Sequence, residues 1–165
     1  MNDKARQLNT TALAYIGDAV YEVYAREHAV KSGHVNVEKL HQAAVGYVNA
    51  ESQAKALKAI LNSLSEKEQD LVRRAKNRKV TSKPKNVDPV AYKYATAFEA
   101  LIGYFYINGN QARMEEIINL AFAEIDRGAV RDCACSKSDC GREIGAGGSD
   151  EQSRQSVHSH VRKDT

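Results

Sequence analysis

The sequence predicts an all-α fold, a bundle of five to seven helices followed by a tail without regular structure. From about residue 7 to 125, apolar side chains recur at spacings of three and four, the period of a helix face, and strand-like alternation is rare. A chain of 165 residues can bury a sizeable core unaided. All three cysteines lie in one polar stretch near the C-terminus, so we expect packing, not disulfides, to hold the bundle together.

The first three helices are delimited by capping residues and by breaks in the apolar pattern. The first runs from about Leu8 to "KSG" at residues 31–33. Asn36 is a suitable N-cap for the second helix, which reaches Val48. A third helix follows directly, with apolar residues at positions 54, 57, 60, 61 and 64.

The later helices are predicted from equally local signals. Ser65 and Glu68 form a capping box that opens a short helix. Asp88 and Pro89 have the residue types preferred at the N-cap and at the first position of the next helix. That helix is apolar nearly all round, so we expect it to be central, and "NGN" at residues 108–110 ends it. A last amphipathic helix carries Met114, Ile117, Ile118, Ala121, Phe122 and Ile125 on one face.

The composition divides the chain into a folded domain, residues 1–126, and a low-complexity tail, residues 127–165. The tail is rich in Gly, Ser, Asp, Arg and Cys and has almost no large apolar residue, so we expect it to be disordered. Its cysteines and histidines are metal-ligand types, but their spacing does not match a common structural zinc motif. These residues are Cys133, Cys135, Cys140, His158 and His160.

The distribution of charge is more informative than the net charge of +3. Residues 73–87 contain seven Lys or Arg and no acid. Such a block is either a solvated basic helix end with its loop or a surface for a polyanion. No apolar run approaches the roughly 18 residues of a membrane span, and the N-terminus does not resemble a signal peptide, so we expect a cytoplasmic protein that does not enter membranes.

Two acids interrupt the most apolar helices. Asp18 lies within "ALAYIGDAVYEVY", residues 12–24, and Glu99 is the only charged residue of "YATAFEALIGYFY", residues 94–106. Burying an unpaired carboxylate costs on the order of several kcal/mol. Each acid therefore needs a partner that compensates its charge. A nearby glycine in each helix lets neighbouring backbones approach, and two touching helices would bring both acids together.

The acids have two interpretations. A single buried acid is usually structural, hydrogen-bonded to a Tyr, an amide or an Arg. For two acids in two apolar segments without Lys or Arg, a shared divalent cation is favoured, because it removes the repulsion between them. Oxygen ligands favour Mg²⁺, with Mn²⁺ as a substitute. Glu22, one turn after Asp18, is either a further ligand through water or an ion-pair partner of Arg26.

The acids and the basic block together indicate a nuclease. Lys and Arg hold phosphates, while a cation bound by carboxylates activates water and stabilises charge on a phosphodiester. The residues expected to bind RNA are Arg73, Arg74, Lys76, Asn77, Arg78, Lys79, Lys83, Lys85 and Asn86.

Several motifs resemble the ribonuclease III family. "YIGDAVYEVY" is similar to the signature helix of that family and "TAFEALIGYFY" to its second catalytic helix, in the same order and separation. The resemblance spans residues 7 to about 125 and is strongest to the short bacterial branch, Mini-ribonuclease III, which consists of the all-α endonuclease domain alone. "LNTTALAYIGDAVYEVYAREH", "RRAKNRKVTSKPKNVD" and "YKYATAFEALIGY" all resemble that branch.

The resemblance implies a specific activity. Asp18 and Glu99 match the catalytic, metal-binding acids of the family, while Thr11, Ala14 and Thr96 stand where larger members carry further acids. It implies a homodimer that cleaves both strands of duplex RNA, leaves 5′-phosphate and 3′-hydroxyl ends, and matures the ends of the 23S ribosomal RNA precursor. The alternatives are a catalytically silent module of this family that binds RNA, and a helical protein-interaction domain whose acids are structural.

Overall fold

The structure confirms the all-α prediction. This computed structural model describes residue 5 and residues 8–33, 35–78 and 88–138, with side chains up to residue 128. Within these ranges the chain forms helices and no strand, and no helix has the length and apolarity needed to cross a membrane. The elements are α1 (Thr10–Lys31), α2 (Val37–Val48), α3 (Ala50–Ile60), the 3-10 turn η2 (Leu61–Ser63), α4 (Glu66–Lys76), α5 (Pro89–Ile107) and α6 (Gln111–Ser138).

Helices α2, α4 and α5 begin at the capping residues that the sequence predicted, and α5 ends at the predicted turn. The side chain of Asn36 accepts a hydrogen bond from the second residue of α2, and the carboxylate of Asp88 accepts two from the first turn of α5. The backbone N–H of Ser65 donates to the Glu68 carboxylate at 2.8 Å, as in a capping box. Gly109, with φ of 68°, follows the end of α5.

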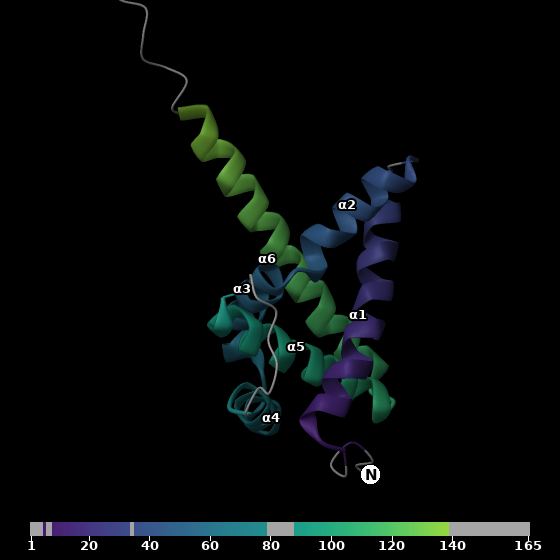
Figure 1. Cartoon of the computed structure of the whole chain (residues 1–165), viewed down its shortest axis with the longest axis vertical. Coiled ribbons are helices and arrows are strands. Elements are labelled where there is room, and N and C mark those ends of the chain that lie inside the picture. The colour runs from purple at the N-terminus through teal and green to yellow at the C-terminus, as the bar shows by residue number, and fades with distance from the viewer. Residues whose placement is uncertain (1–4, 6–7, 34, 79–87, 139–165) are drawn as a thin grey trace, which may run out of the picture.

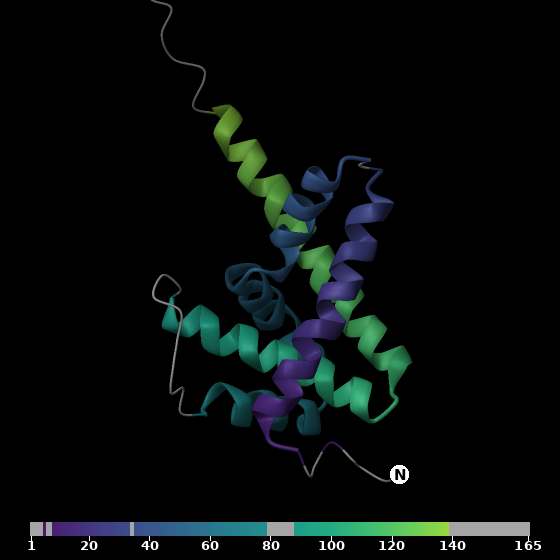
Figure 2. The same cartoon turned by 45° about the vertical axis from the view of Figure 1, so that its right-hand side comes forward.

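Helix α5 is the centre of the bundle. It contacts α1, α3, α4 and α6, and Figure 2 shows it crossing behind α1 and above α4. Its side chains are buried along most of its length, including Phe98, Leu101, Ile102 and Phe105. A helix covered on several sides needs apolar residues nearly all round, which explains why the segment 94–106 has a single charge.

The backbones of α1 and α5 touch at two glycines. A Cβ at Gly17 would lie 2.8 Å from the amide nitrogen of Gly103 and would overlap the carbonyl of Glu99. A Cβ at Gly103 would in turn overlap the carbonyl of Leu13. No side-chain rotation relieves a clash with backbone atoms, so both positions require glycine. The expected approach of the two acid-bearing helices is therefore confirmed.

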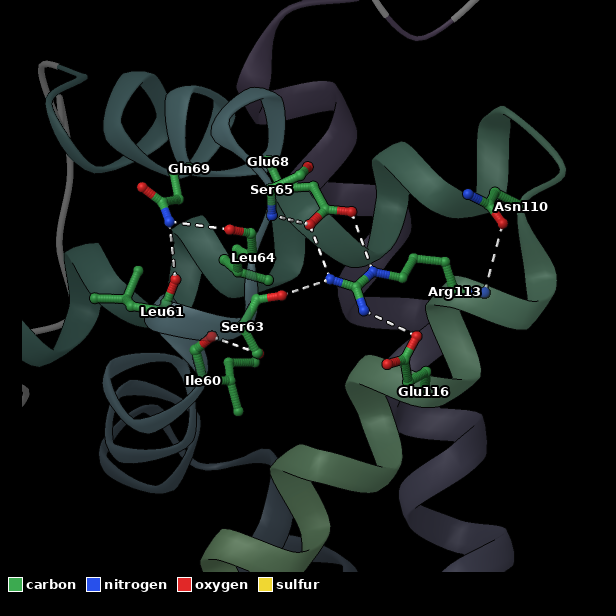
Figure 3. Close-up of polar contacts among 10 residues, drawn as sticks. All are labelled: Ile60, Leu61, Ser63, Leu64, Ser65, Glu68, Gln69, Asn110, Arg113 and Glu116. Atoms are coloured by element: carbon green, nitrogen blue, oxygen red, sulfur yellow. Dashed lines mark hydrogen bonds and ion pairs between the residues drawn. The ribbon is translucent and has the colours of Figure 1, made fainter.

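A polar network fixes α4 against α6 (Figure 3). The guanidinium of Arg113 donates to both carboxylate oxygens of Glu68, at 3.2 and 3.0 Å, and to the carbonyl of Ser63 at 2.9 Å. It also pairs with Glu116 at 2.8 Å. Because Glu68 is buried, its charge is tolerated only with this bidentate partner.

The end of α6 differs from the predicted domain boundary. The helix does not stop near residue 126 but continues to Ser138, and in Figure 1 this part extends beyond the other helices. The sequence between 127 and 138 has no proline and only Gly128 as a weak breaker, so nothing local ends the helix. The expected disorder is therefore wrong for residues 127–138, while Cys140, His158 and His160 lie outside the described residues.

We predict that Gly103→Ala destabilises the chain by about 3 kcal/mol or more, because the methyl group forces the backbones of α1 and α5 apart. Gly46→Ala is the matched control: this glycine lies in α2, where an added Cβ meets nothing within 4 Å, so the substitution should stabilise by roughly 0.5–1 kcal/mol. Urea unfolding measures both. Equal effects of the two substitutions would contradict the close crossing.

A second prediction concerns pH. Burial by itself would raise the pKa of Glu68, but hydrogen bonds from Arg113 and Ser65 outweigh it and hold the pKa below its ordinary value. A lowered folded pKa stabilises the fold above the unfolded pKa of 4.5, and this contribution is lost as the pH falls through the folded pKa.

Glu68→Gln should therefore be less stable than the wild type at pH 7, by about 1–3 kcal/mol. The difference between the two free energies of unfolding should shrink as the pH falls below about 4.5. Urea titrations between pH 7 and 3 measure it. A difference that stays constant over this range would mean that the ionised carboxylate is not what Arg113 stabilises.

Candidate functional site

The crossing of α1 and α5 brings Asp18 and Glu99 together. Asp18 follows the contact glycine Gly17, and the backbone of Glu99 lies directly against that glycine. The charge of Asp18 is close enough to raise the pKa of the Glu99 carboxyl. Two acids that are 81 positions apart in the sequence therefore share one site.

The two acids differ in burial, and the expectation that both are buried is wrong for Asp18. Glu99 is half-buried between α1 and α3, whereas Asp18 is exposed. The buried stripe of α1 runs through Leu13, Gly17 and Tyr21, and Asp18 is rotated about 100° from Gly17, onto the rim of the contact. The site is consequently open to solvent on the Asp18 side.

The electrostatics of the site disfavour two negative charges. Burial raises the pKa of Glu99 to about 8, the charge of Asp18 adds to this effect, and the amide of Gln53 opposes it. Burial also raises the pKa of Asp18, as does the charge of Glu22. Without a cation, burial and the charge of Asp18 therefore favour the protonated form of Glu99, and a divalent ion would reverse this preference.

Gln53 is a site residue that the sequence analysis missed. It lies in α3, is 1 % exposed, and neither polar atom of its side chain has a hydrogen-bond partner among the described residues. Its amide lies near enough to lower the pKa of Glu99, although not in hydrogen-bond geometry. Gln53 has the helical spacing to Leu57 and Ile60 that places it on the buried face of α3. A polar residue on a buried face was the sequence signal that could have identified it.

Glu22 forms the ion pair with Arg26 that one of its two interpretations predicted. Its carboxylate pairs with Arg26, with both N···O distances at 2.7 Å. Its charge nevertheless reaches Asp18 and raises the pKa of that acid. Glu22 thus lies at the edge of the site and is neutralised there by Arg26.

The donor set fits an oxygen-preferring divalent cation. Among the residues described, no three His, Cys, Asp or Glu side chains form a complete metal cluster. The site instead offers the carboxylates of Asp18 and Glu99 and the unbonded amide of Gln53. Mg²⁺ is commonly held by one or two carboxylates, with water and substrate phosphate filling its other positions, so this small set suffices.

The structure describes part of the basic block. Arg73 pairs with Asp70 at 2.7 Å, Arg74 and Arg78 are exposed, and Asn77 is the C-cap of α4. Lys76 is half-buried and contacts a tyrosine of α5. The remaining residues of the predicted RNA-binding set, Lys79, Lys83, Lys85 and Asn86, lie outside the described residues.

A pocket of about 540 Å³ elsewhere on the molecule does not include the acids. It lies between the C-terminal half of α1, α2 and α6, beside His28, Tyr47 and Asp126. Asp18 and Glu99 line none of the pockets described for this part of the chain. A site that is open to solvent on the side of Asp18 suits a large substrate better than an enclosed small molecule.

Comparison with known proteins identifies relatives of this chain. Residues 11–110 match the ribonuclease III domain. The chain is 45% identical over 116 residues to Mini-ribonuclease 3 of Symbiobacterium thermophilum, covering 70% of this chain and 89% of that protein. It is 43% identical over 118 residues to Mini-ribonuclease 3 of Brevibacillus brevis, covering 72% and 88%. A crystal structure of a Fusobacterium nucleatum protein has a TM-score of 0.64 and 33% identity, covering 72% of this chain and 94% of that one.

Proposed function

This chain belongs to the Mini-ribonuclease III branch of the ribonuclease III family, and we propose that it is a metal-dependent endoribonuclease that cleaves double-stranded RNA. The observation that carries the proposal is the site at the crossing of α1 and α5. There, two carboxylates and an amide without a hydrogen-bond partner converge beside open solvent. The raised pKa of Glu99 reflects its burial beside a second acid, an arrangement that a cation would stabilise.

We assign the roles of the site residues as follows. Asp18 and Glu99 are the catalytic acids and would hold Mg²⁺, or Mn²⁺ in its place, and the side-chain amide of Gln53 would provide a further oxygen ligand. When bound, the ion lowers the pKa of water and stabilises charge on a phosphodiester. Glu22 contributes through water once Arg26 releases it. Because the site has few acids, the ion would need oxygen atoms of the substrate phosphate to complete its coordination.

The proposed substrate is the 23S ribosomal RNA precursor, which this enzyme would trim at its ends, leaving 5′-phosphate and 3′-hydroxyl termini. Membership of the Mini-ribonuclease III branch supports this assignment. The enzyme would meet such a substrate in the cytoplasm. The basic block, residues 73–86, is proposed to bind the RNA backbone, because A-form RNA is recognised largely through phosphates and 2′-hydroxyls.

We also propose that the chain acts as a homodimer. Helix α1 exposes a stripe of apolar side chains beside the site, with Tyr15 82% exposed, Val23 54% and Val30 61%. A single domain of this size has one site, whereas cutting both strands at nearby positions requires two. A second copy packed on this stripe by a two-fold axis would cover the apolar side chains and supply the second site.

We predict that Asp18→Asn and Glu99→Gln each lower the rate of duplex RNA cleavage more than about a hundredfold, because a ligand of the ion is removed. Binding of RNA should persist. Gln53→Leu should lower cleavage by about 10–100-fold while stabilising the metal-free chain by roughly 1 kcal/mol, since it removes a buried amide without partners. Cleavage assays with Mg²⁺ and urea unfolding in EDTA measure these effects.

Glu27→Gln is the control, because it removes an exposed acid from the same helix and should leave cleavage unchanged. Cleavage by the wild type that continues in EDTA would contradict the metal site. Unfolded Asp18→Asn and Glu99→Gln variants would indicate structural acids. A Gln53→Leu variant that cleaves normally would exclude Gln53 from the site.

We predict that Tyr15→Asp converts the dimer to monomer, because the introduced charge would be buried in the interface. Val35→Asp is the control, since Val35 is 94% exposed but lies in the connection between α1 and α2. Light scattering at micromolar concentration measures the mass. A monomeric wild type, or a Tyr15→Asp dimer, would contradict this arrangement.

A further inference from the structure

Two lysines from different helices share one tyrosine ring. The Nζ of Lys58, from α3, and the Nζ of Lys76, from α4, each lie 4.8 Å from the centre of the Tyr94 ring in α5. The ammonium of Lys76 also donates a hydrogen bond to the Tyr94 hydroxyl, at 3.4 Å. Both distances to the ring are within the range of cation–π contacts. We refer to Lys58, Tyr94 and Lys76 as the lysine–tyrosine cluster.

The cluster gathers positive charge without neutralising it. Neither lysine forms an ion pair with an acid in the part of the chain that the structure describes, although most of its arginines do. Two ammonium groups beside one ring repel each other, and a shared anion would remove this repulsion. The ring meanwhile restricts both flexible side chains, so an anion would find them already ordered.

Two helices, α3 and α5, carry residues of both the cluster and the candidate site. Gln53 and Lys58 are five residues apart in α3, as are Tyr94 and Glu99 in α5. Gln53 meets Glu99 and Lys58 meets Tyr94, so the two helices run antiparallel here. Five residues of helix advance about 7.5 Å along the axis and turn about 140° around it, which fixes the position of Tyr94 relative to Glu99 on α5. Successive phosphates of one strand of a B-form duplex advance by about 3.4 Å along the helix axis, so a span of this length corresponds to a small number of nucleotides.

We propose that the lysine–tyrosine cluster is a phosphate-binding subsite that holds the RNA backbone one or two nucleotides from the phosphodiester being cleaved. This inference rests on the proposed function, since it specifies how the same site holds its substrate. Lys58 and Lys76 contact the phosphate oxygens, and Tyr94 is a positioning residue that orders the two ammonium groups. The subsite is rigidly spaced from Glu99 because both belong to α5.

The test compares two double variants. Lys58→Gln with Lys76→Gln removes both charges of the cluster. Lys55→Gln with Lys67→Gln is the matched control, because it removes one lysine each from α3 and α4 at exposed positions away from Tyr94. Binding to two duplex RNAs of unrelated sequence is measured in EDTA, which prevents cleavage, at several salt concentrations.

The cluster variant should bind both duplexes about tenfold more weakly than the control and lower the salt slope by up to about 0.7–0.9 for each phosphate that is no longer neutralised. Lys58→Gln alone, at an exposed position, should show part of this weakening with an unchanged melting temperature. Tyr94→Leu should weaken binding while Tyr94→Phe, which keeps the ring, restores most of it.

Affinity and salt slope equal to those of the control would overturn the subsite while leaving the nuclease function in place. Equal binding by Tyr94→Leu and the wild type would overturn the role of the ring. A wild-type chain that neither binds nor cleaves duplex RNA would overturn the proposed function itself, and this inference with it.

Discussion

The structure depends on the contact between the backbones of α1 and α5. Gly17 and Gly103 allow the helices to approach until a Cβ on either one would overlap a carbonyl of the other. At this separation, residues next to the contact come within electrostatic reach across the two helices. Asp18 and Glu99 occupy such positions, so one steric condition sets both the packing of the core and the distance between the acids. A larger residue at either glycine would disturb both together.

The site is less stable than the core that surrounds it. Glu99 has a pKa of about 8 because it is half-buried beside another acid, and Gln53 is buried without a hydrogen bond. Both features cost free energy in the metal-free chain, and the proposed cation would make them favourable. The apolar side chains of α5, including Phe98 and Leu101, are fully buried around the site and stabilise this arrangement. The same residues are therefore unfavourable for folding and suited to holding a charged ligand.

Local sequence signals predicted the helices, and the limits of those signals explain what was missed. Capping residues such as Asn36 and Asp88 act within one helical turn, so they can be recognised from the sequence. A glycine inside an apolar helix likewise indicates a close contact between backbones. The exposure of Asp18 was not predicted, because periodicity locates a buried face but not its rim. Gln53 and Lys58 become functional candidates only through contacts with α5, and such contacts depend on tertiary structure. The extension of α6 was missed because the polar composition after residue 126 was taken to indicate disorder. The absence of a helix breaker there is the better indicator of where the helix ends.

The basic end of α4 has a structural role as well as the proposed functional one. Cations in the last turn interact favourably with the helix dipole, so Arg73 and Lys76 would suit this position without any RNA. The anchor at the other end of α4, the Glu68–Arg113 pair, holds the helix against α6. Arg73 is further neutralised by Asp70, whereas Lys76 is turned toward Tyr94 and Lys58. The two cations therefore differ in their partners. An acid reduces the attraction of Arg73 for a phosphate, whereas a neutral ring orders the side chain of Lys76 and leaves its charge available.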